Sequence, residues 1–160
     1  MSAARFPSLP PGAWWLAGLL ALTAALALLR AAATPPDAPP PPPYRDGASE
    51  EELRALLRDP AVVQRGRRAF AANCTLCHGV HGEGAQGPNL RDDYWLGGSD
   101  MQDIIGCIAD GRAARGMPSW RASLTRDELR ALAAFVASLA GSEDGRGKKP
   151  EGVRRPLGWR

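Results

Sequence analysis

The sequence contains few aromatic residues, and the residue types that favour β-strands do not cluster anywhere in it. Phe, Tyr and Trp make up only 6% of its 160 residues. The periodic stretches are instead rich in Ala, Leu, Arg and Glu, which favour helices. A β-sheet architecture is therefore excluded, and an all-α domain is predicted.

The chain also lacks a strong overall charge. Its formal net charge is +3, and residues 141–160 carry that whole excess, with six basic and three acidic side chains. The basic residues are not interleaved with aromatic ones and no nucleic-acid-binding motif is present, so nucleic acid is excluded as a partner. Residues 141–160 are polar and Gly-rich, which predicts a disordered basic tail, either solvated or in contact with anionic lipid or an acidic partner.

The sequence has a single long apolar run, Ala13 to Leu29, with no charge in its 17 residues. Such a run forms a helix of roughly 26 Å, which is near the thickness of a hydrocarbon core. Trp14 and Trp15 stand where interfacial aromatics belong. We predict one membrane anchor within residues 1–33, with the N-terminus inside. The alternative is a signal peptide cleaved after Ala33.

A Pro-rich linker, residues 34–47, follows the apolar run. Its PPDAPPPPP segment favours an extended polyproline II spacer or a disordered linker. The folded domain is predicted to cover residues 48–140.

Three capping patterns predict where helices begin in this domain. Ser49, Ser99 and Thr125 are each followed three residues later by Glu or Gln. Gly111 and Gly141 are predicted to end the second and third of these helices.

A further helix is predicted over residues 61–73. Gly66 would permit a close helix crossing, and Phe70 would pack on Leu132 and Phe135 of the last helix.

Cysteine is scarce, with three residues, which excludes a disulfide framework. Two of them lie in Cys74-Thr75-Leu76-Cys77-His78, the C-x-x-C-H pattern of covalent haem attachment. Two thioethers fix one porphyrin edge, and His78 then projects its imidazole under the iron. A thioredoxin-like pair would need a βαβ setting, and a zinc site with His81 would lack the usual intervening loop. Cys107, among isoleucines, is predicted to be a buried, inert thiol.

Met117 is the predicted sixth ligand of the haem iron. It lies in Gly116-Met117-Pro118-Ser119-Trp120, where Gly and Pro would let a stiff loop approach the haem. A thioether favours reduced iron. An open sixth position is the alternative, and the other side chains considered are Met1, Met101 and His81.

Other residues are predicted to surround the haem. The Pro88 carbonyl would accept a hydrogen bond from the His78 ring, and Asn89 would wrap the haem edge beside it. Arg112 would pair with a haem propionate or stay solvated.

The order of these motifs resembles a class I cytochrome c. It is similar, more narrowly, to the first haem domain of the dihaem cytochrome c subunit (subunit III) of cbb-type haem-copper cytochrome c oxidases. The matching segments are Glu50–Leu57, Asp59-Pro60, Gly66–Phe70, Pro88–Leu90, Trp95–Gly98, Arg112 and Met117–Trp120. That subunit has two C-x-x-C-H motifs, whereas this chain has one.

The resemblance implies an all-α cytochrome c fold with one N-terminal transmembrane helix. It implies one haem c held by Cys74, Cys77, His78 and Met117, with Trp120 beside the last. Electrons would pass from a cytochrome c donor towards a terminal oxidase in a respiratory chain.

A His–Met haem leaves no iron site for a substrate, so we expect an electron-transfer protein and not an enzyme on its own. Covalent haem attachment places the domain on the periplasmic side of the inner membrane. The alternatives are a free periplasmic shuttle, a haem sensor or small-molecule-binding enzyme with a labile Met ligand, and a structural or assembly subunit.

Overall fold

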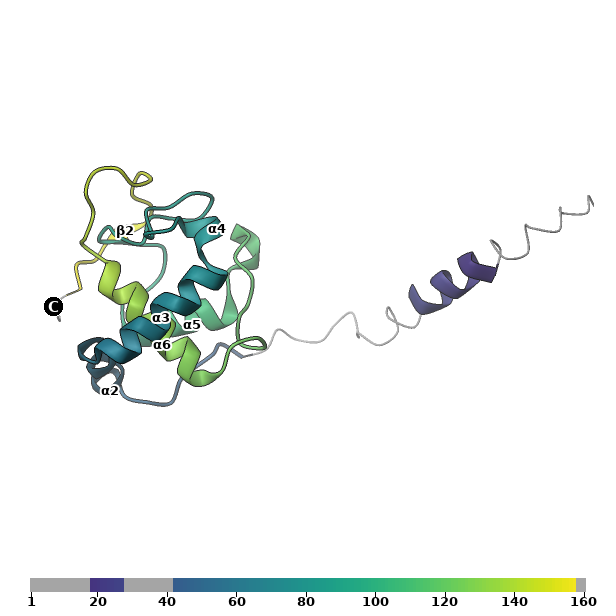
Figure 1. Cartoon of the computed structure of the whole chain (residues 1–160), viewed down its shortest axis with the longest axis horizontal. Helices are drawn as coiled ribbons and strands as arrows, with labels where there is room; N and C mark the ends of the chain where they lie inside the picture. Colours follow the sequence, from purple (N-terminus) through teal and green to yellow (C-terminus); the bar gives the residue numbers. More distant parts are fainter. Residues whose placement is uncertain (1–17, 28–41, 158–160) are drawn as a thin grey trace, which may run out of the picture. The chain divides into compact units, whose positions relative to one another are not determined.

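The computed structural model describes residues 18–27 and 42–157 (Figure 1). The chain divides into two units, Met1–Pro41 and Pro42–Arg160, which are described separately. In the first unit residues 18–27 form a helix, and the rest of the predicted anchor and most of the linker lie outside the described residues. Within the described part, no helix has the length and apolar character needed to span a membrane.

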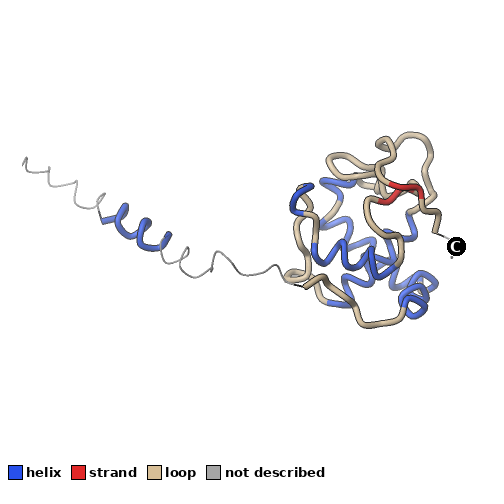
Figure 2. Tube along the Cα trace, turned by 180° about the vertical axis from the view of Figure 1, so that it is seen from behind, coloured by secondary structure: helices blue, strands red, loops and turns tan. Residues whose placement is uncertain are grey.

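The second unit is mostly helical, as predicted (Figure 2). Its elements in chain order are α2 (Glu50–Ala55), η1 (Leu56–Arg58), α3 (Pro60–Asn73), α4 (Thr75–His78), β1 (Tyr94–Trp95), α5 (Met101–Asp110), η2 (Ala113–Arg115), α6 (Arg126–Leu139) and β2 (Val153–Arg154).

Two of the three predicted capping boxes are confirmed. The Ser49 hydroxyl accepts from the Glu52 amide, and the Glu52 carboxylate accepts from the Ser49 amide at 2.8 Å. Thr125 and Glu128 make the same reciprocal pair at the start of α6. These pairs satisfy amides that the first helical turn leaves without partners.

The capping box predicted at Ser99 is wrong. The N-cap residue of α5 is Asp100, and its side chain makes no capping hydrogen bond. Instead, the Glu50 carboxylate accepts from the amides of Met101 at 2.9 Å and Gln102 at 3.3 Å. A carboxylate is favoured at a helix N-terminus wherever it comes from, and here it comes from α2.

The core of the domain is the crossing of α3 and α6, which lies in the middle of the folded domain in Figure 1. Gly66 packs directly on the backbone of Ala131, so that a Cβ at Gly66 would overlap the Ala131 carbonyl and lie 2.8 Å from the Phe135 Cβ. Phe70 is fully buried, and its ring centroid lies 5.2 Å from that of Phe135, which confirms the predicted contact.

A buried ion pair ties the start of the domain to α6. The Asp46 side chain is completely buried, and both its oxygens accept from Arg130 at 2.6–3.0 Å. Burial raises the pKa of Asp46, but the hydrogen bonds from Arg130 and the Ala48 amide outweigh it, so that the pKa lies below its ordinary value of 3.8.

Removing Arg130 from this pair is expected to destabilise the domain more than removing the Asp46 charge. Arg130→Met would leave a buried carboxylate alone and cost about 3 kcal/mol, whereas Asp46→Asn leaves a partly exposed Arg130 and costs about 1 kcal/mol. Because the folded-state pKa of Asp46 is lowered, its stabilisation is complete above about pH 4 and is lost as the pH falls through that lowered value. Urea unfolding at pH 7 and pH 3 measures both effects; equal costs at pH 7 would contradict the asymmetry.

The C-terminal residues do not form the disordered tail that composition predicts. Residues 142–157, here called the C-terminal strap, fold back onto the domain, and residues 158–160 lie outside the described part. β2 pairs antiparallel with β1, with Tyr94 opposite Arg154 and Trp95 opposite Val153. Leu157 is buried in the core. A polar, Gly-rich segment is ordered here because its partners are distant in sequence.

Candidate haem site

The two motif cysteines lie where α3 gives way to the single turn α4. Cys74 is at once the C-cap of α3 and the N-cap of α4. Cys74 and Cys77 are half-buried and not joined by a disulfide. Burial, together with the neighbouring Cys77, raises the pKa of the Cys74 thiol to about 11. A thioredoxin-like pair needs a lowered thiol pKa, so this environment disfavours that reading.

The His78 ring has one nitrogen engaged and one available. Its Nδ1 lies 3.1 Å from the Pro88 carbonyl oxygen, the hydrogen bond expected from the sequence. A carbonyl can only accept, so Nδ1 carries the proton, and Nε2 of the neutral ring has a free lone pair. Burial lowers the pKa of His78 more than the Pro88 bond raises it, and the charge of Lys148 lowers it further. The ring is therefore a neutral imidazole at pH 7, the form that binds metals.

The loop after α4 wraps around this ring. The Gly84 amide donates to the His78 carbonyl at 2.7 Å, and the Gly87 amide donates to the Cys77 carbonyl at 2.8 Å. A Cβ at Gly87 would lie 2.8 Å from the His78 Cε1, so this position admits only glycine without rearrangement. Sequence reasoning missed Gly87, although its place just before the Pro88–Leu90 segment was a usable signal.

A zinc site is not formed at the motif. His81 is exposed, and its amide donates to Glu83 at 2.7 Å. Among the described residues no three His, Cys, Asp or Glu side chains are grouped as metal ligands would be. The structure describes all four ligands that a zinc site here would use, Cys74, Cys77, His78 and His81. Their arrangement therefore disfavours a zinc site.

Met117 is held in a short, defined loop after η2. Its backbone forms an isolated antiparallel bridge with Arg112, with N–O distances of 2.9 and 3.2 Å. Gly116 before it has a φ of +82°, a conformation that favours glycine. Met117 is half-buried against the core, whereas Met101 is fully buried within it. Met101 is thus a core residue.

Three other residues predicted to contact the haem have side chains that contact other parts of the protein. Asn89 is buried, and its side chain contacts Glu143, the Lys148 carbonyl and the Arg91 amide. Arg112 donates from Nε to the Cys107 sulfur at 3.2 Å. Cys107 is half-buried, whereas the sequence predicted a buried thiol. Trp120 is half-buried against the core.

Trp95 carries an unsatisfied donor. Its indole Nε1 is buried and has no hydrogen-bond partner among the described residues. A buried donor without an acceptor costs about 1–3 kcal/mol, so native structures rarely retain one without a reason. The Trp95 nitrogen therefore indicates an acceptor that the described chain does not supply.

Comparison with known proteins finds a family similar to part of the domain. Residues 61–136 match the family model described as cytochrome C oxidase, cbb3-type, subunit III. This part of the chain is thus similar to a cytochrome c domain of cbb3-type subunit III. The resemblance seen in the order of the sequence motifs is thereby confirmed.

Two relatives show the extent of the similarity. The cbb3-type cytochrome c oxidase subunit FixP of Bradyrhizobium diazoefficiens is 42% identical over 82 residues, covering 49% of this chain and 28% of the relative. Subunit CcoP of Rubrivivax gelatinosus is 38% identical over 89 residues, covering 55% and 29%. The matched part of the chain thus spans under a third of either relative's length.

Solved structures are also similar, among them cytochrome cL from Methylophaga aminisulfidivorans. It is 29% identical, with a TM-score of 0.48, covering 57% of this chain and 70% of that one.

Proposed function

We propose that the domain binds one haem c covalently and transfers electrons. Thioethers from Cys74 and Cys77 would attach the haem, and His78 Nε2 and Met117 Sδ would ligate its iron. The observation that carries this proposal is His78, whose Nδ1 is anchored on Pro88 and whose Nε2 is free, directly after two reduced thiols on one turn.

The remaining groups of the site fit a haem. The Cys74 and Cys77 thiols are unpaired, as thioether formation requires. The unpartnered Trp95 indole and the Arg112 guanidinium are donors suited to haem propionates. Pro88 and Asn89 hold the proximal loop, and Trp120 follows the Met117 loop.

The bound haem would supply a one-electron couple. His78 and Met117 would both ligate the iron, which would leave no place for a substrate and favours electron transfer over catalysis. Met117 would raise the reduction potential, and the Pro88 hydrogen bond would fix the plane of the His78 ring.

We further propose that residues 13–29 anchor the protein in the inner membrane, with the cytochrome domain in the periplasm. The similarity to cbb3-type subunits supports electron delivery from a cytochrome c donor to a cbb-type terminal oxidase, as a subunit or a close donor.

Mild-detergent extraction of native membranes, followed by a native gel stained for haem and for oxidase activity, tests this role. Migration of this haem with oxidase activity supports the subunit role. Migration alone, together with slow re-oxidation by oxidase-containing membranes in oxygen, would contradict it. Recovery of the haem only in the soluble periplasmic fraction would contradict the anchor and indicate cleavage after Ala33.

Trp95→Phe is expected to lower the haem reduction potential by up to ~60 mV, which is a tenfold change for one electron. Loss of the indole donor leaves a propionate charge less neutralised, and this favours the oxidised iron. Tyr94→Phe is the matched control, since Tyr94 is exposed and adjoins Trp95 in β1. Redox titration measures both; an equal shift in the two variants would contradict the assignment of the Trp95 nitrogen.

A further inference from the structure

The C-terminal strap places one ammonium group against the loop that carries the His78 hydrogen-bond acceptor. Lys148 Nζ donates to the carbonyl oxygens of Gln86 at 3.2 Å and Gly87 at 3.3 Å. These are the two peptides immediately before Pro88, whose own carbonyl accepts from His78 Nδ1. The Lys148 side chain therefore contacts the backbone that orients the His78 ring.

Lys148 is itself held on several sides. Its amide donates to the Glu83 carbonyl at 2.8 Å, and its carbonyl accepts from Asn89 at 3.3 Å. Its ammonium pairs with the Glu151 carboxylate at 2.7 Å. Its Cβ lies so close to Gly84 that a Cβ there would come within 2.8 Å of it. Both the backbone and the side chain of Lys148 are thus held against the loop that contains Gly87.

We propose that Lys148 is a positioning residue for the axial ligand His78, and that its charge favours reduced iron. The inference rests on the proposed haem function. Two charge-assisted hydrogen bonds fix the peptides of Gln86 and Gly87, and so keep the Pro88 carbonyl directed at Nδ1. A positive charge near the iron disfavours its oxidised, more positive state.

In the alternative interpretation, Lys148 forms only a surface ion pair with Glu151. Its side chain is 35% exposed, and such pairs contribute little to stability. That alternative predicts no effect on His78 or on the iron. The two readings therefore differ in redox and spectroscopic properties, and not in stability alone.

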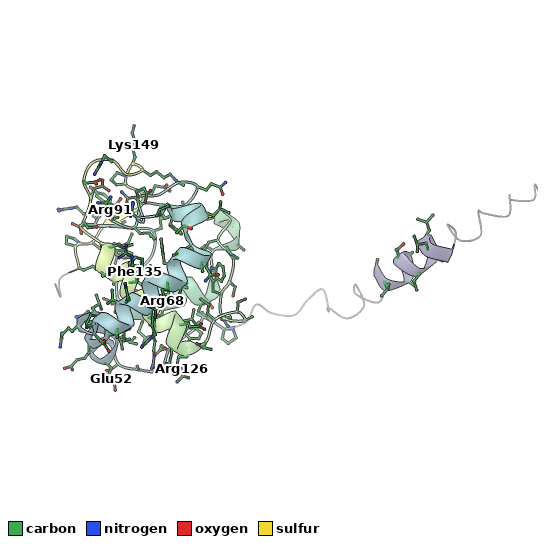
Figure 3. All side chains as sticks on the ribbon, in the orientation of Figure 1. Glu52, Arg68, Arg91, Arg126, Phe135 and Lys149 are labelled. Carbon is green, nitrogen blue, oxygen red and sulfur yellow. The ribbon has the colours of Figure 1, made fainter. Side chains whose placement is uncertain are left out.

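Three variants of the full-length haem protein test the proposal. Lys148→Met removes the charge and the donors, and Lys148→Arg keeps both. Lys149→Met removes a neighbouring charge whose exposed side chain extends away from the domain (Figure 3). The readouts are the midpoint potential, the NMR resonance of the His78 Nδ1 proton, and hydrogen exchange of the Gly87 amide.

We expect Lys148→Met to reduce the equilibrium constant for haem reduction about tenfold, equivalent to 59 mV. The His78 Nδ1 proton should shift, and the Gly87 amide should exchange about tenfold faster. Lys148→Arg should retain most of the wild-type potential, Nδ1 resonance position and Gly87 exchange rate. Lys149→Met should change the equilibrium constant for reduction and the exchange rate by no more than twofold, and should leave the Nδ1 resonance in place.

Two results would overturn the proposal. Equal shifts of the potential in Lys148→Met and Lys149→Met would reveal a general charge effect, and unchanged Gly87 exchange with an unchanged Nδ1 resonance would show that Lys148 positions nothing. Failure of the haem function is separate: the wild-type protein would then lack covalent haem by denaturing gel and haem stain, while Gly87 exchange would still report on Lys148.

Discussion

Met117→Ala is expected to turn a six-coordinate electron carrier into a haem protein that binds small ligands. Met117 lies in a loop fixed by its bridge to Arg112 and by the left-handed Gly116, and residues 112–124 contain no other Met or His to replace it. Loss of the thioether removes the ligand that favours reduced iron. The reduction potential should fall by roughly 0.1–0.3 V, within the range that axial ligands span.

Carbon monoxide binding to the reduced protein measures this change. The reduced wild-type protein should not bind carbon monoxide at neutral pH, and Met117→Ala should bind it readily. Met101→Leu is the control, because Met101 is fully buried in the core and a Leu there conserves most of its volume. Carbon monoxide binding by the wild-type protein would instead favour a sensor or a ligand-binding enzyme.

Gly66→Ala is expected to cost about 3 kcal/mol of unfolding free energy or more. The added Cβ would overlap the Ala131 carbonyl, and a backbone atom cannot rotate away as a side chain does. The helices α3 and α6 would have to separate along their whole contact, which exceeds the usual 1–3 kcal/mol of overpacking. Chemical denaturation followed by circular dichroism measures the loss.

Gly106→Ala is the matched control for Gly66→Ala. Both glycines lie within helices, so both variants gain the same helical propensity. At Gly106 a Cβ would meet only the Tyr44 carbonyl, at 3.3 Å. Its stability should stay within about 1 kcal/mol of the wild type. Equal effects of the two substitutions would contradict a specific α3–α6 contact.

Features of the fold that depend on neighbouring residues could be predicted from the sequence. The caps at Ser49 and Thr125 join residues three apart, and the apolar faces that carry Phe70 and Phe135 follow from the period of each helix. The cap of α5 could not be predicted, because Glu50 lies about fifty residues before Met101. Neither could the C-terminal strap, whose composition is that of a disordered segment and whose order depends on pairing with β1.

The same distinction applies to the candidate site. The spacing of Cys74, Cys77 and His78 is local, and Pro88 lies only ten residues after His78. Lys148 reaches the site from the strap, and no local pattern could reveal it.

Two predicted haem contacts differ for the same reason. Asn89 is predicted to wrap the haem edge, and Arg112 to pair with a propionate or stay solvated, but their side chains also contact partners that only the folded chain brings near. Those partners are Glu143 for Asn89 and Cys107 for Arg112.

The proton NMR spectrum of the reduced wild-type protein tests the central claim most directly. Haem held by His78 and Met117 predicts a diamagnetic spectrum with one methionine methyl resonance shifted far upfield by the haem ring current, and this resonance should be absent in Met117→Ala. A paramagnetic spectrum without that resonance, or a protein without any haem signal, would contradict the account.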